Sequence, residues 1–380
     1  MLTKEICLIS VNCLQTENAS RNRLLSFING YINHGYKVKL ISMDLDNYKI
    51  FDHPNFEHYK IPTVNTKISS FTKRAILEIQ IAKKAIKIAN SLNCELNLIT
   101  IPSMFLLQMS FLLNKNTKKI LDIRDLSWEY ISEKSLFSKL SKRILKYGAL
   151  INIKNFDIIS VTNTYEKQYL NKIILKNQSI IMVPNGVSEE TYSKLSSLKN
   201  ISHTNPTITY IGNIGLAQDL STLVEIAKAI PDIKINIGGT GTDFSRIKNT
   251  VNSNDKNINL LGQLKLEEIL EIYSRSDILY AQLTPDFSTA MPSKLYEYLA
   301  TGKYILYAGE GVAVETLNQF ENLSIVPPCN INALKFEILK ILKDESYKNI
   351  SNSNKLKINN EYLRDKTVNK LILSSDNLYV

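Results

Sequence analysis

The chain has 380 residues, of which 44% are hydrophobic and 22% charged, and its formal net charge is +10. This length exceeds the size at which a single core keeps growing, so we expect two domains. No segment approaches the roughly 18 uncharged apolar residues of a membrane-spanning helix. The first residues, MLTKEICLISV, lack the basic region and cleavage site of a signal peptide, so we expect a cytoplasmic protein.

Basic residues are concentrated in the first half of the chain. Residues 1–200 hold 28 Lys and Arg against 16 Asp and Glu, whereas the remainder holds 18 against 20. Such an excess is typical of proteins that meet nucleic acid, an anionic membrane surface or a phosphorylated substrate. The lysines are dispersed without a nucleic-acid-binding motif, so we expect no nucleic acid partner. The four Cys and four His residues show no metal-ligand spacing, which predicts that no metal is bound.

Apolar runs alternate with amphipathic segments through the first half. The first helix is predicted to begin with Ser20 as its N-cap and to end at Gly35, and further helices are expected at residues 71–90, 105–113 and 165–171. Strands are predicted at residues 6–11, 38–42, 56–61, 96–101, 120–123, 158–162 and 180–183. This alternation predicts a doubly wound α/β domain.

The alternation restarts after a polar stretch. Residues 188–206 lack a clear period, so we expect a linker at 191–206 between a first domain at 1–190 and a second at 207–359. A C-terminal segment at 360–380, with a helix near 362–372, is expected to pack back on the first domain. Two Rossmann-like domains with a cleft between them are therefore predicted. The strands and helices expected in the second domain lie at residues 208–211, 220–230, 233–237, 244–251, 258–261, 266–273, 278–283, 312–320, 323–326 and 331–342.

The stretch from Pro285 to Gly311 carries the chemistry of the second domain. It reads as a loop, a short helix with Ser293 as N-cap, a stop at Gly302 and a buried strand at 304–308. The start of a helix favours an anion, and Lys294 adds a positive charge there. Glu297, one turn later, could accept hydrogen bonds from a sugar diol. The alternative is that Glu297 is a solvated residue on the helix face.

Glycines follow three predicted strands of the second domain. They stand at Gly212 and Gly215, at Gly238, Gly239 and Gly241, and at Gly262. A ligand that approaches the backbone closely requires glycine, although strand-to-helix turns also favour it. No G-x-G-x-x-G opens either domain and no G-x-x-x-x-G-K-[ST] is present, which argues against a nicotinamide dinucleotide site and against a Walker-type ATPase.

Six short motifs, in order along the chain, resemble a known family. They are VPNGV (183–187), ITYIGNIG (208–215), INIGGTG (235–241), INLLGQL (258–264), SRSDILYAQL (274–283) and PSKLYEYLATGK (292–303). Together they resemble the retaining GT-B glycosyltransferases of family 4, of the type that builds bacterial surface polysaccharides. The resemblance covers nearly the whole chain and is more specific in the second domain. It implies two Rossmann-like domains, a nucleotide-sugar donor and a glycan or lipid-linked glycan acceptor.

The resemblance implies a donor site in the second domain. Glu297 matches the second glutamate of the family's paired-glutamate motif, which binds the ribose hydroxyls, but Thr289 stands where the first glutamate is expected. The family's diphosphate-binding Arg and Lys align with Asn213 and Gln218. Lys294 is the nearest substitute. The residues expected to bind the donor are Glu297, Lys294, Thr289, Ala290, Met291, Ser293, Gly212, Asn213, Gly215, Gly239, Gln263 and Leu264.

Within that donor site, the backbone N–H groups around Ala290 and Met291, with Lys294, are expected to hold the diphosphate. Gly215 would let the chain approach it, and Gln263 and Leu264 occupy the turn that contacts the base in relatives.

The acceptor site is expected in the first domain, in the segment LDIRDLSWEY. Here Asp122, Arg124 and Asp125 follow a strand and Trp128, the only Trp, is close by. Asp125 is the candidate to orient or deprotonate the acceptor hydroxyl, with Arg124 beside it. The alternative is an Arg–Asp pair that only closes the strand end. The loop 12–20 lacks the family's glycines, and Arg21 and Asn22 after it are further candidates.

Residues 134–147, KSLFSKLSKRILKY, form a separate amphipathic segment. Leu136, Phe137, Leu140, Ile144 and Leu145 make an apolar stripe, and Lys139, Lys142, Arg143 and Lys146 a basic one. This pattern is typical of a helix that lies on an anionic membrane, and equally of a packing helix with one solvated face.

These features predict a metal-independent, retaining glycosyltransferase without a cofactor, which acts in the cytoplasm or at the inner face of the cell membrane. Two alternatives remain at the level of sequence. A sugar-nucleotide 2-epimerase has the same architecture, and Thr289, Asn213 and Gln218 allow a non-catalytic protein that binds nucleotide sugars.

Overall fold

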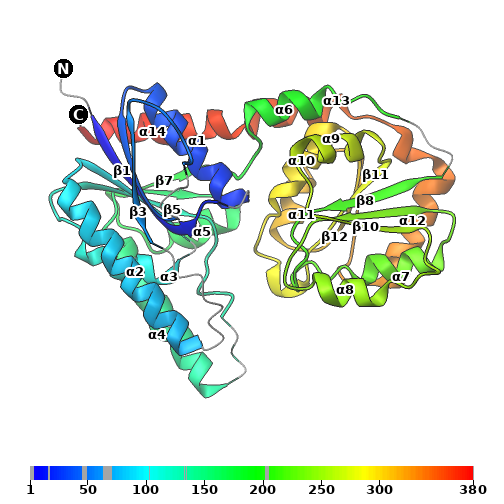
Figure 1. The fold of residues 1–380 in the computed structure, drawn as a ribbon, viewed down its shortest axis with the longest axis horizontal. Coiled ribbons are helices and arrows are strands. Elements are labelled where there is room, and N and C mark those ends of the chain that lie inside the picture. Colours follow the sequence, from blue (N-terminus) through cyan, green and yellow to red (C-terminus); the bar gives the residue numbers. More distant parts are fainter. Residues whose placement is uncertain are drawn as a thin grey trace. The chain divides into compact units, whose positions relative to one another are not determined.

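The computed structural model describes residues 4–15, 18–44, 49–62, 71–101, 103–131, 133, 135–201 and 205–379. The chain divides into two compact units. Unit 1 comprises Met1–Asn185 and Arg364–Val380, and unit 2 comprises Gly186–Leu363. Each unit is built around its own sheet (Figure 1).

The sheet of unit 1 has seven parallel strands in the order β3-β2-β1-β4-β5-β6-β7. Its central strands are apolar runs buried on both faces, as parallel sheets require; all six residues of β4, for example, are buried. The strands are β1 (Glu5–Cys13), β2 (Lys37–Met43), β3 (Phe56–Ile61), β4 (Leu96–Ile101), β5 (Lys118–Ile123), β6 (Ile158–Val161) and β7 (Ser179–Met182).

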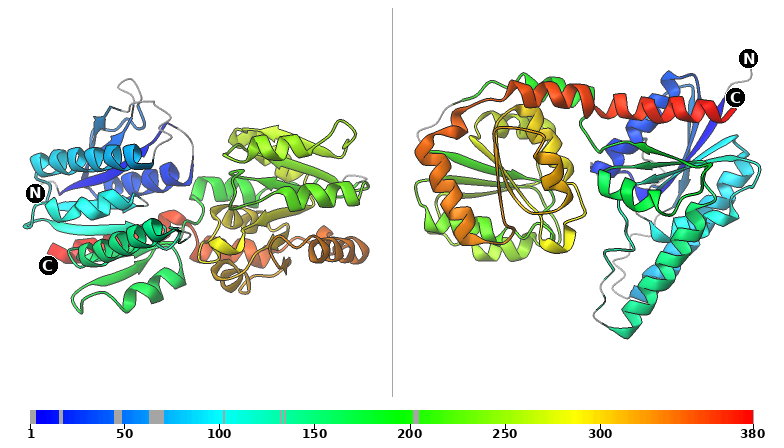
Figure 2. Two further views of the ribbon diagram at one scale, coloured as in Figure 1. Left: turned by 90° about the horizontal axis from the view of Figure 1, so that it is seen from below. Right: turned by 180° about the vertical axis from the view of Figure 1, so that it is seen from behind.

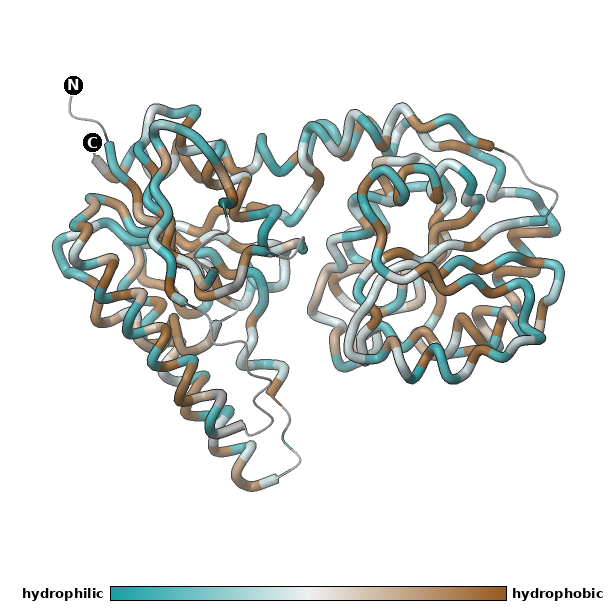
Figure 3. Tube along the Cα trace, in the orientation of Figure 1, coloured by the Kyte–Doolittle hydropathy of each residue, from teal (hydrophilic) through white to brown (hydrophobic). Residues whose placement is uncertain are grey.

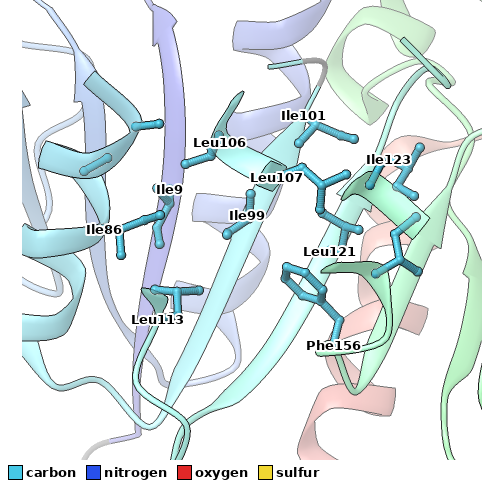
Figure 4. Packing of buried hydrophobic residues seen from close by; sticks show 14 of the residues in the cluster. Ile9, Ile86, Ile99, Ile101, Leu106, Leu107, Leu113, Leu121, Ile123 and Phe156 are labelled. Carbon is cyan, nitrogen blue, oxygen red and sulfur yellow. The ribbon is translucent and has the colours of Figure 1, made fainter. Parts of the chain in front are cut away.

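Helices cover both faces of this sheet (Figure 2). One face packs on α1 (Ala19–Asn33) and α14 (Arg364–Asp376). The other packs on α2 (Phe71–Leu92), α3 (Met104–Met109), α4 (Leu136–Ile153) and α5 (Thr164–Asn171). Figure 4 shows this second layer, in which Leu106 and Leu107 of α3 lie over Ile99 and Leu121 of the sheet.

The chain returns to unit 1 through its last helix. Val368, Leu371 and Ile372 of α14 are fully buried. Tyr31 donates a hydrogen bond of 3.3 Å to Ser375, and Tyr36 one of 2.6 Å to Asp376. The helix expected near 362–372 is α14, which begins at Arg364, whereas α13 (Asn352–Glu361) of unit 2 was not predicted.

The sheet of unit 2 has six parallel strands in the order β10-β9-β8-β11-β12-β13. Relative to the first strand of the unit this is the Rossmann order 3-2-1-4-5-6. The strands are β8 (Thr207–Ile211), β9 (Lys234–Gly238), β10 (Ile258–Gly262), β11 (Ile278–Gln282), β12 (Tyr304–Ala308) and β13 (Leu323–Val326). Figure 3 shows that apolar residues line these central strands.

Two helical layers enclose this second sheet. One layer holds α7 (Ser221–Ala229), α8 (Phe244–Thr250) and α12 (Ile331–Asp344). The other holds α6 (Glu189–Ser196), α9 (Leu266–Ser274), α10 (Ser293–Thr301), α11 (Val312–Leu317) and α13. Short 3₁₀ turns complete the described chain at Ser110–Leu112, Pro285–Phe287, Ser346–Lys348 and Asn377–Tyr379.

Three expectations about helix starts and boundaries need correction. The N-cap of α1 is Asn18, whose side chain accepts a hydrogen bond from the Arg21 N–H, and Ser20 lies inside the helix. Pro292, not Ser293, occupies the N-cap position of α10. The units divide at residues 185 and 186, and the expected linker at 191–206 begins within α6. The polar serines of α6 hid its single buried leucine, Leu195, from the periodicity.

Candidate functional site

The strand order of unit 2 fixes where a ligand can bind. Adjacent parallel strands whose connections run in opposite directions leave a crevice at their carboxyl ends, and in this sheet those strands are β8 and β11. The loops that follow them, residues 212–220 and 283–292, touch directly. The Thr284 N–H donates to the Ala217 carbonyl at 2.8 Å, and Gln282 Nε2 donates to the carbonyls of Gln218 and Asp219 at 2.9 and 2.7 Å.

The glycine loops after β8, β9 and β10 pack backbone against backbone. The Gly212 N–H donates to the Gly238 carbonyl at 3.0 Å, and the Gly239 N–H to the Gly262 carbonyl at 2.6 Å. Gly239 has a φ of +126°, and a Cβ there would collide with the Gly212 carbonyl. Glycine is therefore required at 239 for loop packing, whether or not a ligand also lies there.

Amide side chains close the loop after β8, at the positions where the family resemblance predicts an Arg and a Lys. Gln218 Oε1 accepts hydrogen bonds from Asn213 Nδ2 at 3.3 Å and from the Gly215 N–H at 3.2 Å. Tyr210 beneath the loop donates to the Asn213 carbonyl at 2.5 Å. Asn213, Gly215 and Gln218 thus lie together and form a neutral turn.

A cation that the sequence analysis missed lies beside this loop. Arg246 of α8 forms ion pairs of 2.6 Å with both Asp219 and Asp243. Hydrogen bonds to these two carboxylates raise the pKa of the Arg246 guanidinium. Because two carboxylates share one guanidinium, the cluster offers no net positive charge to an anion. Only the fold brings Arg246 to Asp219, which lies 27 residues earlier in the chain.

The start of α10 combines free N–H groups with an ion pair. The Ala290 N–H already donates to the Phe287 carbonyl at 2.9 Å, so it is not available for the diphosphate as expected. In the described part of the chain, the N–H groups of Met291, Ser293 and Lys294 donate no hydrogen bond. Lys294 Nζ lies 2.7 Å from Glu297 Oε2. The helix start therefore presents N–H groups, an ammonium group and a carboxylate within one turn.

The loop that leads to α10 is also held in place by the start of α11. The Val312 N–H donates to the Ser288 carbonyl at 2.9 Å, and Gly311, with a φ of +71°, leaves room for that carbonyl. Thr289 lies in this pinned loop. The predicted base-contacting turn follows β10, where Gln263 is exposed and Leu264 packs over Gly238.

In unit 1, the predicted acceptor segment contains a buried ion pair that was not foreseen. Asp122 lies within β5 and pairs with Arg23 of α1 at 2.6 Å, and both side chains are buried. The hydroxyls of Ser160 and Thr100 also donate to Asp122, at 2.5 and 2.9 Å. Burial acts to raise the pKa of Asp122, but Arg23 and these hydroxyls hold the pKa below its usual value. Asp122 is therefore a structural anion.

Arg124 and Asp125 lie at the carboxyl end of β5, as predicted. Arg124 Nη1 donates to the Ser20 hydroxyl at the start of α1, while its Nε has no hydrogen-bond partner among the described residues. Burial, followed by the charge of Arg23, lowers the pKa of Arg124. Burial raises the pKa of Asp125, against the opposing effect of Arg124. No described group donates a hydrogen bond to the Asp125 carboxylate, which suits a group that receives a proton.

A second carboxylate, Glu166 of α5, belongs to the same cluster. Its Oε2 accepts hydrogen bonds from the Thr162 N–H at 2.7 Å and the Thr162 hydroxyl at 3.0 Å. Burial is the main cause that raises the pKa of Glu166 to about 8, and the charge of Asp125 adds to it. The spacing of Asn163 and Glu166 is that of a helix capping box, which could have indicated the position of Glu166 but not its burial.

The remaining candidates of unit 1 are one core residue and two residues at the start of α1. Trp128 is buried, and its Nε1 donates to the Tyr169 hydroxyl at 3.4 Å, so it is a core residue. Arg21 and Asn22 lie in the first turn of α1, where Asn22 is exposed. The loop 12–20 lies partly outside the described residues, as does Lys134 of the basic segment.

Comparisons with known proteins agree with this arrangement. Residues 193–357 match the protein family described as Glycosyl transferases group 1. The structure is similar to sucrose-phosphate synthase from Thermosynechococcus elongatus, with a TM-score of 0.78 and 17% identity over 99% of each chain. No curated protein sequence shows significant similarity to the chain.

Two further solved structures share the fold. Anabaena Alr3699/HepE, solved in complex with UDP and glucose, has a TM-score of 0.67 and 12% identity, and the match covers 98% of this chain and 99% of that one. WaaG, a glycosyltransferase involved in lipopolysaccharide biosynthesis, has a TM-score of 0.69 and 9% identity, with 96% and 99% covered. The chain has the GT-B fold. The family match and these neighbours together support a glycosyltransferase.

Within this GT-B fold, the matched segment contains all the predicted donor residues. The glycine loops, the amide turn and the start of α10 all lie between residues 193 and 357. In the described part of the chain, no three His, Cys, Asp or Glu side chains are grouped in a way that could hold a metal ion. Nor is any described helix both long and apolar enough to cross a membrane.

Proposed function

We propose that this protein is a retaining glycosyltransferase of family 4 that moves a sugar from a nucleotide-sugar donor to a glycan or lipid-linked glycan acceptor. The pathway we propose is the synthesis of a bacterial surface polysaccharide, in the cytoplasm at the inner face of the cell membrane. The observation that carries the proposal is the start of α10, at the switch point of a Rossmann sheet. Here Lys294, Glu297 and three N–H groups without a hydrogen-bond partner among the described residues lie together.

The donor is held through its diphosphate and ribose in this proposal. The N–H groups of Met291, Ser293 and Lys294, with the Lys294 ammonium group, bind the diphosphate at the positive end of the helix dipole. Glu297 accepts hydrogen bonds from the ribose hydroxyls. Because Lys294 and Glu297 lie side by side, they match an anion joined to a diol. Charge-assisted hydrogen bonds of this kind contribute about 1.5–3 kcal/mol each.

No metal ion takes part in the proposed reaction. The bond from the sugar to the diphosphate breaks, the diphosphate leaves as an anion, and the acceptor hydroxyl bonds to the sugar on the same face. The leaving diphosphate helps to accept the hydroxyl proton, while Asp125 and Arg124 orient the acceptor. Positioning and stabilisation of the anion are then the protein's main contributions.

The amide turn also supports a second candidate function. Asn213 and Gln218 place no cation beside the diphosphate, and Thr289 replaces a glutamate, so a protein that binds nucleotide sugars without transferring them remains a distinct hypothesis. It predicts binding without turnover on any acceptor.

Glu297→Gln tests the donor site directly. We expect the nucleotide diphosphate and its sugar to bind the wild type and to raise its stability by about 2.7 kcal/mol at 100 times the dissociation constant. The variant should bind at least roughly tenfold more weakly, because one charge-assisted interaction is lost. Thermal shift with a panel of nucleotide sugars measures both. Glu267→Gln, on the exposed start of α9, is the matched control.

The outcome separates the hypotheses. Transfer to an acceptor supports the enzyme, binding alone supports the second candidate, and conversion of the donor without an acceptor indicates an epimerase. A wild type that binds no nucleotide sugar refutes the donor site.

A further inference from the structure

Helix α4 packs on unit 1 through its last turns, where Ala149, Asn152 and Ile153 are buried, and it turns most of its other large apolar residues outwards. At Gly148 the helix lies so close to α3 that a Cβ would collide with the Gln108 side chain, and Gln108 donates a hydrogen bond of 2.7 Å to the Leu145 carbonyl. An ordinary amphipathic helix buries most of its large apolar side chains, whereas α4 fully buries only Ile153 among them.

The outer face carries a continuous apolar stripe. The exposed fractions of Leu136, Phe137, Leu140 and Ile144 are 86%, 66%, 57% and 62%. Tyr147 and Ile151 extend the stripe, whereas Leu145, which the sequence pattern included, is partly buried. Positions 136, 140, 144, 147 and 151 recur every three or four residues and so lie on one side of the helix. Contiguous exposed apolar surface of this kind marks an interaction site.

The stripe belongs to the part of unit 1 that extends beyond its sheet. Figures 1 and 2 show the first half of α4 projecting past the ends of the strands. The stripe is therefore accessible along the length of the projection.

Cations flank the stripe on one side, and the structure divides them into two pairs. Lys142 and Lys146 face carboxylates: Lys142 pairs with Glu133 at 2.8 Å, and Lys146 with Glu129 at 2.7 Å. Lys139 and Arg143 are exposed and form no ion pair with a described carboxylate. The 18 residues of α4 include no acidic residue. Positive charge that is not paired with a described carboxylate therefore lies next to the exposed apolar side chains.

We propose that this face of α4, from Leu136 to Ile151, is a docking surface for an anionic lipid bilayer. Leu136, Phe137, Leu140 and Ile144 enter the acyl–headgroup boundary, and Lys139 and Arg143 contact anionic headgroups. This membrane contact would keep the enzyme beside a lipid-linked acceptor, so its purpose rests on the proposed function.

The charge pattern argues against a second copy of the chain as the partner. A two-fold interface brings the same patch of both copies together. Lys139 and Arg143 would then meet their own counterparts without an acidic residue of α4 to compensate them. An anionic membrane would bury the apolar stripe and also neutralise the positive charges beside it.

Two pairs of variants with matched controls test the surface, using the full chain. Leu140→Ser/Ile144→Ser removes apolar side chains that are already exposed, so the fold should be unaffected. Its control is Phe336→Ser/Leu339→Ser on α12 of unit 2, where both side chains are also exposed. Lys139→Gln/Arg143→Gln removes two positive charges, and Lys256→Gln/Lys343→Gln removes two from exposed sites of unit 2.

Co-sedimentation with vesicles measures the effect. We expect the wild type to bind vesicles of mixed phosphatidylglycerol and phosphatidylcholine and to bind phosphatidylcholine alone much more weakly. Lys139→Gln/Arg143→Gln should weaken binding to the mixed vesicles roughly thirtyfold, at about fivefold for each cation. Leu140→Ser/Ile144→Ser should abolish it, and both controls should bind nearly as the wild type does.

Three results would overturn the proposal. They are a wild type that does not sediment with anionic vesicles, equal binding by Leu140→Ser/Ile144→Ser, and a wild-type dimer in solution that this variant dissociates. The assay contains no nucleotide sugar, so a failure of sugar transfer would not affect its result.

Discussion

Glu166 is the side chain whose ionisation should most affect the stability of unit 1. Its pKa rises from an ordinary value of 4.5 to about 8 in the fold, mainly through burial. Between these two pH values the folded chain holds a proton that the unfolded chain releases. The protonated Glu166 therefore stabilises the folded chain fully below the pKa of the unfolded chain. This stabilisation is lost as the pH rises through the pKa of the folded chain, about 8. Over this range the loss is on the order of 5 kcal/mol.

Glu166→Gln should remove this dependence. Its amide can still accept the hydrogen bonds from Thr162, so we expect nearly equal stability of variant and wild type at about pH 5. At about pH 9 the variant should be the more stable by roughly 3–4 kcal/mol, because it has no proton to lose. Urea denaturation followed by Trp128 fluorescence measures the difference, with the exposed Glu133→Gln as control. A stability difference that does not change with pH would contradict the assigned pKa.

Some of the residues discussed above could be predicted from the sequence, and others could not. Arg124, Asp125, Lys294 and Glu297 could be proposed as site residues because the local pattern reveals that the first two follow a strand and the last two lie in the first two turns of a helix. Glu166 could not, because its raised pKa depends on burial that only the packed fold creates. Arg246 was missed because Asp219 reaches it only when β8 and β9 pair, although Asp243 lies just three residues before it.

At the scale of elements, the Asp122–Arg23 pair joins α1 to the centre of the first sheet. Arg23 also donates to the Val183 carbonyl at 2.8 Å, and Asp122 accepts from Ser160 on β6. Asp122→Ala would leave a buried guanidinium unpaired, so we expect a loss of about 3–5 kcal/mol. The double variant Arg23→Met/Asp122→Leu should lie closer to the wild type, because no buried charge remains. Thermal denaturation compares them, and a double variant that is less stable than Asp122→Ala would refute this account.

The glycine loops of unit 2 make a second prediction at this scale. Gly239→Ala places a Cβ against the Gly212 carbonyl, so the loops after β8 and β9 must separate. Gly262 also has a positive φ, of +67°, but a Cβ there would meet nothing within 4 Å. We expect Gly262→Ala to cost only about 1 kcal/mol, the penalty for the backbone conformation, and Gly239→Ala clearly more. Urea denaturation provides the comparison, and equal costs would show that the loops do not constrain each other.

Element boundaries were predictable where the signal is local. Leu96–Ile101 matches the observed strand residue for residue, because a buried parallel strand is a mostly apolar run. Phe56–Ile61 also matches its strand, although this edge strand is only partly buried. The exact start of α10 and the division between the units could not be predicted, since they depend on partners far along the chain. The Val187 N–H, for instance, donates to the Tyr362 carbonyl, which holds the start of unit 2 to its end.

The whole molecule consists of two units with separate cores and a shared chain that crosses between them twice. The crossings lie next to residues 185 and 363, and α14 closes the core of unit 1 after the second. The only Trp, Trp128, is buried in unit 1. Its fluorescence therefore reports on unit 1, whereas helical circular dichroism reports on both units.

This arrangement predicts that the two units unfold as separate transitions. Leu371→Ala in α14 and Leu299→Ala in α10 each remove a fully buried leucine, one from each core, and should each cost about 2–5 kcal/mol. Only Leu371→Ala should lower the urea midpoint of Trp128 fluorescence. Leu299→Ala should shift the circular dichroism transition and leave the fluorescence midpoint unchanged. If Leu299→Ala moved the Trp128 midpoint as far as Leu371→Ala does, the two cores would be one cooperative body, and stability gained by unit 2 on binding a nucleotide would then reach unit 1 as well.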